Sequence, residues 1–254
     1  MEASQIKILI VDDEVELLKN ISEVFTLFGF TVKTASGGTE AWQMLQAENY
    51  DLVISDVRMP NGDGIELLSK CKERNPYSPK VLLISGFNDH KHEELLDFGV
   101  DGFFTKPFDA TAVRNAIKET LLDIKALWGS NKEISAQKTL TIKISNLESS
   151  HNVQFGRRGV FIRMNIDFPK VGQIIKFIID IEDVKPVSQI IGWGSVMWVR
   201  ERAQVEKEPG VGVLIQQIDN EALNPFVDWI LGKKFISLIP LGTKKANENE
   251  NGIN

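Results

Sequence analysis

Three aspartates in the N-terminal half have the residue type and spacing for metal and phosphoryl chemistry. Asp12 and Asp13 directly follow one apolar run, and Asp56 follows another. Carboxylates brought within a few Å of one another repel strongly unless a divalent cation lies among them. Mg²⁺ is the hard cation that carboxylate, water and phosphate oxygens hold, and no His or Cys accompanies these aspartates to favour zinc. The three acids therefore predict a magnesium site.

A lysine and a serine would complete a clamp around a phosphoryl group. Lys106 follows the last apolar run of this half, where its ammonium could pair with an anionic group on Asp56. Ser85 ends the preceding run, and its hydroxyl could bond a second oxygen of that group. Phosphoryl transfer depends mostly on positioning and charge stabilisation, which a metal ion, an ammonium and a hydroxyl supply together. Asp56 is the predicted nucleophile, which would form an aspartyl-phosphate.

Short apolar runs alternate with helix-period stretches through this half, and the alternation predicts how those residues are positioned. The expected strands are Ile6–Val11, Phe30–Ala35, Leu52–Ser55, Val81–Ser85 and Gly102–Phe104. The expected helices are about Val15–Phe28, Gly38–Glu48, Gly64–Arg74 and His90–Phe98, with a fifth from near Asp109. Five strand–helix units imply right-handed crossovers and a doubly wound α/β domain with a parallel sheet. Ligands bind such sheets at the carboxyl ends of the strands, so the five candidate residues should converge there.

From about residue 126 onwards, strands follow one another without intervening helices. The expected strands are Leu140–Ile144, Gly159–Met164, Gln173–Ile181, Gln189–Val199 and Gly210–Gln216, with a helix at about Asn224–Leu231. This succession predicts a small antiparallel β-barrel or sandwich that a helix closes at one end. The expected domains are 1–125 and 138–240, joined by a linker at 126–137 and followed by a disordered tail at 241–254.

Apolar residues keep helical spacing past the fifth helix of the first half, as far as Trp128. We therefore expect that helix to run on into the linker, either packed within the chain or as a dimer contact. In the second half, Trp193 and Trp198 are five residues apart, which places them on opposite faces of an unbulged strand. One of the two indoles is then a candidate contact residue on the surface.

Composition narrows the classes of function. With 254 residues, 43% hydrophobic and 25% charged, the chain is expected to form two globular domains. Residues 1–125 hold 13 Lys and Arg against 21 Asp and Glu, net −8, and residues 126–254 hold 16 against 14, net +2. Neither half has the basic stripe of a DNA-reading protein. No apolar run approaches the ~20 residues of a membrane helix, and the acids near the N-terminus argue against a signal peptide, so a cytoplasmic protein is expected. Cys71 is the only cysteine and is expected to be a buried structural thiol.

Four motifs of the first half resemble the receiver domain of two-component response regulators: VDDE at 11–14, DVRMPNGDG at 56–64, SGF at 85–87 and FFTKPF at 103–108. The resemblance implies a flavodoxin-like fold with Asp56 as the phosphate acceptor. It implies that Mg²⁺ is held by Asp13, Asp56 and the backbone carbonyl of Arg58, and by Asp12 directly or through water. It also implies that Ser85 and Lys106 bind the phosphoryl oxygens and that the Lys106–Pro107 peptide bond is cis.

The same resemblance also implies a switch residue and binding partners. Phe103 falls at the switch aromatic position, where the family often has Tyr, so one hydrogen bond of the active state is missing. A sensor histidine kinase is implied as the phosphoryl donor, and a homodimer through the receiver is a further possibility. Self-phosphorylation and slow dephosphorylation would be the only catalysis of such a protein. It would therefore not be an enzyme in the usual sense.

The second half is similar to PilZ domains in QFGRRGVFIRM at 154–164, GWGSVMWV at 192–199 and PGVGVLIQQI at 209–218. That family is a six-stranded barrel with a closing helix, and it commonly binds cyclic di-GMP through an R-x-x-x-R pair and a D/N-x-S-x-x-G loop. This chain departs from both motifs: Gln154 and Gly156 replace the acid and the serine, and no arginine lies between Arg114 and Arg157.

Two adjacent arginines leave a cyclic di-GMP site open as an alternative. Arg157 and Arg158 could bind phosphate, or they could be solvated on a surface turn. The favoured interpretation is a PilZ-like output domain that contacts a protein partner and regulates a surface process such as motility or adhesion, as the family implies. The alternative is an integrator of phosphorylation and cyclic di-GMP. A catalytic second half has little support, because His151 is its only histidine and no nucleophile motif accompanies it.

Overall fold

The computed structural model describes residues 6–86, 95, 96, 98–129, 133–145, 150–181, 188–205, 207–232, 237–240 and 242. The chain divides into two compact units, Met1–Asp123 with Lys234–Leu238, and Ile124–Lys233 with Ile239–Asn254. The tail expected at 241–254 lies outside the described residues, except for Gly242. The domain limits expected from the sequence stay predictions.

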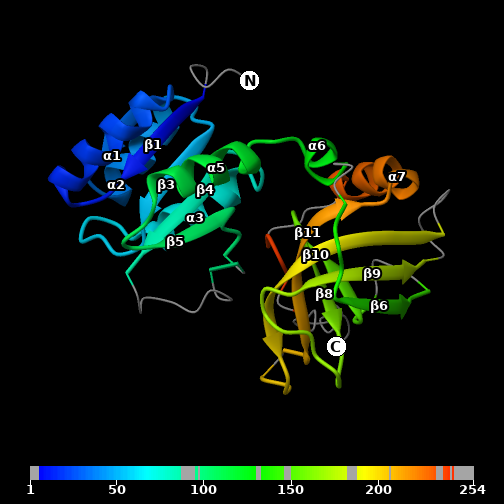
Figure 1. Cartoon of the computed structure of the whole chain (residues 1–254). Helices are drawn as coiled ribbons and strands as arrows, with labels where there is room; N and C mark the ends of the chain where they lie inside the picture. Colours follow the sequence, from blue (N-terminus) through cyan, green and yellow to red (C-terminus); the bar gives the residue numbers. More distant parts are fainter. Residues whose placement is uncertain are drawn as a thin grey trace, which may run out of the picture. The chain divides into compact units, whose positions relative to one another are not determined.

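The N-terminal unit contains a five-stranded parallel sheet with the order β2-β1-β3-β4-β5 (Figure 1). Its strands are β1 (Lys7–Val11), β2 (Thr31–Ala35), β3 (Leu52–Asp56), β4 (Lys80–Ser85) and β5 (Gly102–Thr105). Its helices are α1 (Val15–Leu27), α2 (Gly38–Ala47), α3 (Gly64–Arg74) and α5 (Ala110–Thr120). Contacts pair α1 with α5 and α2 with α3, so helices cover the sheet on both faces. The predicted doubly wound α/β fold is confirmed.

Burial explains why these runs become strands. All five residues of β3 are buried, as is every residue of β4 after Lys80, and strands covered on both faces need such continuous apolar runs. Side chains such as Ile10, Ile54 and Phe25 form one core between the sheet and its helices. In the stretch expected to be a helix at 90–98, Leu95 and Leu96 are helical and buried, whereas His90 and His92 lie outside the described residues.

Cys71 is buried in α3, as expected, and burial raises the pKa of its thiol to about 11. Within the part of the chain that the structure describes, no helix has both the length and the apolar character needed to cross a membrane.

The C-terminal unit is a curled half-barrel of six strands with the order β6-β9-β10-β11-β8-β7. Its strands are β6 (Lys138–Lys143), β7 (Val153–Phe155), β8 (Gly159–Arg163), β9 (Ile174–Asp180), β10 (Gln189–Arg200) and β11 (Gly210–Ile218). The helix α7 (Asn220–Leu231) lies across one end of the sheet (Figure 1). The expected β-rich domain with a late helix is confirmed.

One pair of strands differs from the antiparallel expectation. β6 and β9 run parallel, whereas the remaining pairs are antiparallel. β7 and β8 separate β6 from β9 along the chain, so no hairpin turn imposes the antiparallel direction on this pair. The sheet is therefore mixed.

Glycines in the C-terminal motifs leave room for aromatic rings. A Cβ atom on Gly212 would lie 2.1 Å from Nε1 of Trp198, and one on Gly192 would lie 2.2 Å from the ring of Phe177. Trp198 is buried and stacks on Phe161, with ring centroids 5.8 Å apart. These positions need glycine because the rings occupy the space that a Cβ atom would fill.

The two tryptophans of β10 lie on opposite faces, as expected. Trp198 is buried, whereas Trp193 is half-buried on the other face with Lys176 Nζ 5.3 Å from the centre of its ring. β10 is not the unbulged strand assumed in that expectation, because its register against β11 shifts twice. Burial still alternates residue by residue along the whole strand.

The expectation of a continuous fifth helix is wrong. α5 ends at Thr120, and a separate short helix, α6 (Ile124–Trp128), follows. Trp128 is fully buried in the C-terminal unit, where it stacks on Phe226 of α7 with ring centroids 5.9 Å apart. Two helices of equal period joined by a short turn give the same apolar spacing as one long helix, so periodicity alone could not separate them. This segment was expected either to pack within the chain or to form a dimer contact, and Trp128 packs within the chain.

Candidate functional site

Strand ends of the N-terminal unit gather two acids and a lysine. Asp12 follows β1, Asp56 is the last residue of β3, and Lys106 follows β5. Nζ of Lys106 lies 2.6 Å from Oδ1 of Asp56 and 3.0 Å from Oδ2 of Asp12. The structure thus brings these three predicted site residues together at the carboxyl edge of the sheet.

Backbone groups fix the orientation of both carboxylates. The N–H of Arg58 donates to Oδ2 of Asp56 at 2.7 Å, and the N–H of Glu14 donates to Oδ1 of Asp12 at 2.9 Å. One oxygen of each carboxylate is therefore held by the main chain, while the other faces the lysine. Asp12 is 3% exposed and Asp56 is 7% exposed, so this small cluster is largely withdrawn from solvent.

Burial and charge shift the protonation of the cluster. Burial raises the pKa of Asp56 above its ordinary value, against the hydrogen bond and positive charge of Lys106, which lower it. Burial also lowers the pKa of Lys106, but the hydrogen bonds from its ammonium to Asp56 and Asp12 outweigh burial and leave that pKa raised. The ionised Asp56 is thus incompletely compensated by the lysine, and further positive charge would favour its ionised form.

The remaining predicted residues surround this cluster. Asp13 is exposed beside Asp12, and Ser85 is buried at the end of β4. The backbone N–H of Lys106 donates to the carbonyl of Ser85 at 2.8 Å, which ties the two strand ends together. Phe103 lies half-buried in β5, paired with Leu83 of β4. The roles assigned to these residues stay predictions.

One local feature implied by the resemblance is present. The Lys106–Pro107 peptide bond is cis, and so is Ser78–Pro79.

The donor set suits a hard divalent cation. Among the described residues, no three His, Cys, Asp or Glu side chains are already grouped as metal ligands, and the ammonium of Lys106 is bonded to both buried carboxylates. The donors at this edge are nevertheless all oxygens, and a cation would favour the ionised form of Asp56, whose pKa is raised chiefly by burial. Asp12, Asp13, Asp56 and the Arg58 carbonyl are therefore the residues that would hold Mg²⁺.

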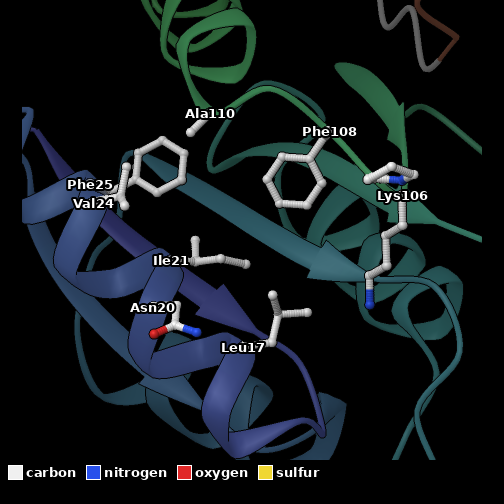
Figure 2. Close-up of a pocket in the computed structure, with 9 residues that line it drawn as sticks. Leu17, Asn20, Ile21, Val24, Phe25, Lys106, Phe108 and Ala110 are labelled. Carbon is white, nitrogen blue, oxygen red and sulfur yellow. The ribbon is translucent and has the colours of Figure 1, made fainter.

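An apolar groove beside the cluster was not foreseen from the sequence. The cavity has a volume of about 530 Å³, and its lining is Leu17, Asn20, Ile21, Val24, Phe25, Lys106, Pro107, Phe108 and Ala110. Figure 2 shows Leu17, Ile21 and Phe25 of α1 facing Phe108 across it, with Lys106 at one end. The sequence did contain one signal for this groove. α1 carries the apolar residues Leu17 and Val24 in addition to its buried stripe of Leu18, Ile21 and Phe25.

The adjacent arginines Arg157 and Arg158 differ in burial. Arg157 is 3% exposed, so it is not the solvated side chain that one alternative described. Arg158 is half-buried, and its carbonyl accepts a hydrogen bond from the N–H of Ile215 at 2.9 Å. The loop is tight because the N–H of Gly156 donates to the carbonyl of Gly159 at 2.8 Å. Cyclic di-GMP binding at these arginines stays a prediction.

Comparison with known proteins identifies the N-terminal unit. Residues 8–118 match the model of the response regulator receiver domain. Sporulation initiation phosphotransferase F of Bacillus subtilis is 33% identical over 116 residues, which cover 45% of this chain and 93% of that protein. The chain belongs to the response regulator receiver family. The prediction that the first half of the chain is a receiver domain is thereby confirmed for residues 8–118.

Other relatives share only part of their length with this chain. Transcriptional regulatory protein GlrR of Escherichia coli is 36% identical over 114 residues, which cover 45% of this chain and 26% of that protein. The chain thus spans about a quarter of that relative. Among solved structures, the response regulator TrrA of Thermotoga maritima with Mg²⁺ and BeF is 29% identical, with a TM-score of 0.43; the match covers 46% of this chain and 100% of that one.

Receiver domains share several general properties. Receivers are phosphorylated on an aspartate, bind Mg²⁺ and take part in two-component systems with a histidine kinase as partner. They typically have no enzymatic activity beyond self-phosphorylation.

Proposed function

We propose that a sensor histidine kinase phosphorylates the receiver on Asp56 and that the receiver then signals through a PilZ-like C-terminal domain. The observation that carries the assignment of Asp56 is its position at the end of β3, bonded to Lys106 at 2.6 Å and buried beside Asp12. Asp56 combines a position at the carboxyl end of a strand, a paired lysine and a raised pKa.

The geometry around Asp56 supports phosphoryl transfer. An oxygen of the Asp56 carboxylate would attack the phosphorus, the bond from phosphorus to the imidazole nitrogen of the donor would break, and that nitrogen would leave with the electron pair. Bound Mg²⁺ would neutralise charge on the transferring group. The ammonium of Lys106 and the hydroxyl of Ser85 would bond the other phosphoryl oxygens. The backbone N–H of Arg58 holds the second carboxylate oxygen at 2.7 Å, so the attacking oxygen is oriented in advance.

The apolar groove gives the kinase a place to dock. It ends at Lys106, and its walls of Leu17, Ile21 and Phe108 would accept apolar side chains of a helical partner. A donor held there would lie beside the strand ends that carry Asp56. We therefore assign kinase docking to this face of α1.

The C-terminal domain is proposed to recognise a protein. The outer face of β9 and β10 carries Trp193 beside Lys176, and next to them the directly paired Ile178 and Ile191, all half-buried. Apolar and aromatic side chains on the solvent side of an antiparallel sheet are typical of contact surfaces. The missing arginine pair and serine of the cyclic di-GMP motifs favour the same interpretation.

Cyclic di-GMP sensing is the second candidate, and the burial of Arg157 argues against it. The buried guanidinium of Arg157 is poorly placed to form a bidentate hydrogen bond with a ligand at the surface. Calorimetry with cyclic di-GMP, with and without Mg²⁺ and beryllofluoride, distinguishes the two. We expect no heat of binding in either state, whereas saturable micromolar binding would establish the integrator.

Acetyl phosphate tests the assignment of Asp56. With Mg²⁺, the intact mass of the full chain should rise by one phosphoryl group, and Asp56→Asn should abolish the gain. Asp51→Asn is the matched control, because it removes a carboxylate next to the opposite end of the same strand. A mass gain that persists in Asp56→Asn would refute the assignment.

A further inference from the structure

The loop between Asp56 and α3 is bonded to the first turn of α2. α2 begins at Gly38, and its N-cap Gly37 supplies no side-chain hydrogen bond. The first N–H groups of a helix have no partner inside the helix. Here the N–H of Gly38 donates to the carbonyl of Gly62 at 3.1 Å, and the N–H of Thr39 donates to the carbonyl of Asn61 at 3.0 Å. The loop therefore caps the helix with its own backbone.

This contact requires glycine on both sides. A Cβ atom on Gly38 would lie 2.7 Å from the carbonyl oxygen of Gly62, and one on Gly62 would lie 2.9 Å from the nitrogen of Thr39. Real Cβ atoms essentially never approach a backbone atom below 3.0 Å. Gly62 also has a backbone φ of +98°, which residues with a side chain rarely adopt. A side chain at either position would push the loop away from α2.

The other end of the loop is bonded to Val57 and packs closely against the backbone of Asp56. A Cβ atom on Gly64 would lie 2.1 Å from the carbonyl oxygen of Asp56, and the N–H of Gly64 donates to the carbonyl of Val57 at 2.9 Å. Arg58 lies between Val57 and Asn61 in this loop, and its N–H holds Oδ2 of Asp56. A displacement at Gly62 would therefore act on the backbone that orients the Asp56 carboxylate.

We propose that Gly38 and Gly62 are positioning residues for the phosphorylation site, and that their close contact sets the affinity of the site for Mg²⁺ through the backbone of Arg58. This inference rests on the proposed function of Asp56. Neither glycine touches the acids, so their effect is transmitted by the loop. Removing a group that orients a metal ligand typically weakens binding by about 10- to 100-fold.

Calorimetric titration of the full chain with MgCl₂ tests the proposal. In Gly38→Ala, we expect the dissociation constant for Mg²⁺ to rise by about tenfold. The Mg²⁺ concentration that gives half the maximal rate of phosphorylation by acetyl phosphate should rise by the same factor. A glycine with a merely structural role would change neither half-saturation value. Thr39→Ala is the matched control, because it keeps the backbone N–H and alters only an exposed side chain.

The variants also separate failure of the proposal from failure of the proposed function. If the wild-type chain neither bound Mg²⁺ nor gained a phosphoryl group at Asp56, the proposed function itself would be refuted. If the wild type did both and a folded Gly38→Ala matched it in Mg²⁺ affinity, only the positioning role would be overturned. Should Gly38→Ala fail to fold by circular dichroism, Gly62→Asn replaces it, since asparagine accepts a positive φ better than most residues and still presents a Cβ atom to Thr39. Unfolding of both variants would overturn the proposal as well.

Discussion

The two units of this chain place their charged and aromatic side chains differently. In the receiver, Asp12, Asp56 and Lys106 converge at one edge of the sheet, and their spare oxygens are held by backbone N–H groups. In the C-terminal unit, the buried Arg200 donates to the carbonyl of Glu208 at 2.9 Å and lies over the ring of Trp198, 4.8 Å from its centre. The receiver thus gathers charged groups at one strand edge, whereas Arg200 in the second unit packs against an indole ring.

A cluster of aromatic rings surrounds Phe226 in the C-terminal unit. Phe226 of α7 is in contact with Trp128, Phe155 and Trp229, with ring centroids between 4.7 and 6.0 Å away. This cluster joins α6, α7 and β7 into one layer of the C-terminal unit. α6 follows α5 of the receiver after only Leu121–Asp123, so the first element of the C-terminal unit is close in the chain to the last helix of the receiver.

Removal of Trp128 should have the largest effect and should be confined to one unit. Trp128→Ala deletes a fully buried indole, and such a truncation costs about 3–5 kcal/mol. We expect hydrogen exchange to accelerate in β7 and α7 and to remain unchanged in β1 and β3. Trp193→Ala, on the half-buried outer face, is the control with a smaller expected effect. Equal acceleration in both units would contradict the view that this cluster belongs to the C-terminal unit alone.

Neutralisation of Asp56 should stabilise the receiver when Mg²⁺ is absent. The pKa of Asp56 is raised in the folded state, so its favourable contribution is complete below the unfolded pKa and is lost as the pH rises through the folded pKa. Asp56→Asn should therefore melt at a higher temperature than wild type at pH 7, by an amount corresponding to about 1 kcal/mol, and the difference should vanish in acid. Saturating Mg²⁺ should reverse the order, because the ion stabilises only the chain that binds it.

The smallest expected effect concerns the ion pair between α6 and α7. Nζ of Lys125 lies 2.9 Å from Oδ1 of Asp228, and both side chains are exposed. Exposed pairs contribute about 0.2–1 kcal/mol, so Lys125→Ala should shift the denaturant midpoint of the C-terminal unit only slightly. Raising the salt concentration should reduce even this difference. A loss approaching that of Trp128→Ala would show that charge, rather than aromatic packing, holds α6 in place.

The receiver could be predicted from sequence because its signals are local. Apolar runs buried on both faces define the strands, and the functional residues stand directly at strand ends, as Asp56 and Lys106 do. The parallel sheet then determines which strand ends meet. The groove beside Lys106 and the contact between Gly38 and Gly62 could not be predicted this way, because both depend on how separate segments approach one another.

The C-terminal unit was less predictable for the same reason. β7 has only three residues, too few for a periodic pattern, and was not expected. The parallel pairing of β6 with β9 and the break between α5 and α6 are set by long-range packing, of which Trp128 is the clearest case. The glycines of β10 and β11 were visible as motifs, but the rings of Phe177 and Trp198 that explain them became evident only in the structure.

Hydrogen exchange of the full chain, before and after addition of beryllofluoride with Mg²⁺, tests the central claim most directly. The account predicts slower exchange in the Val57–Asp63 loop together with altered exchange in α6, α7 or β7, and no change anywhere in Asp56→Asn. Protection of the loop without any change in the C-terminal unit would contradict signalling from one unit to the other. An unchanged loop in the wild type would contradict the assignment of Asp56.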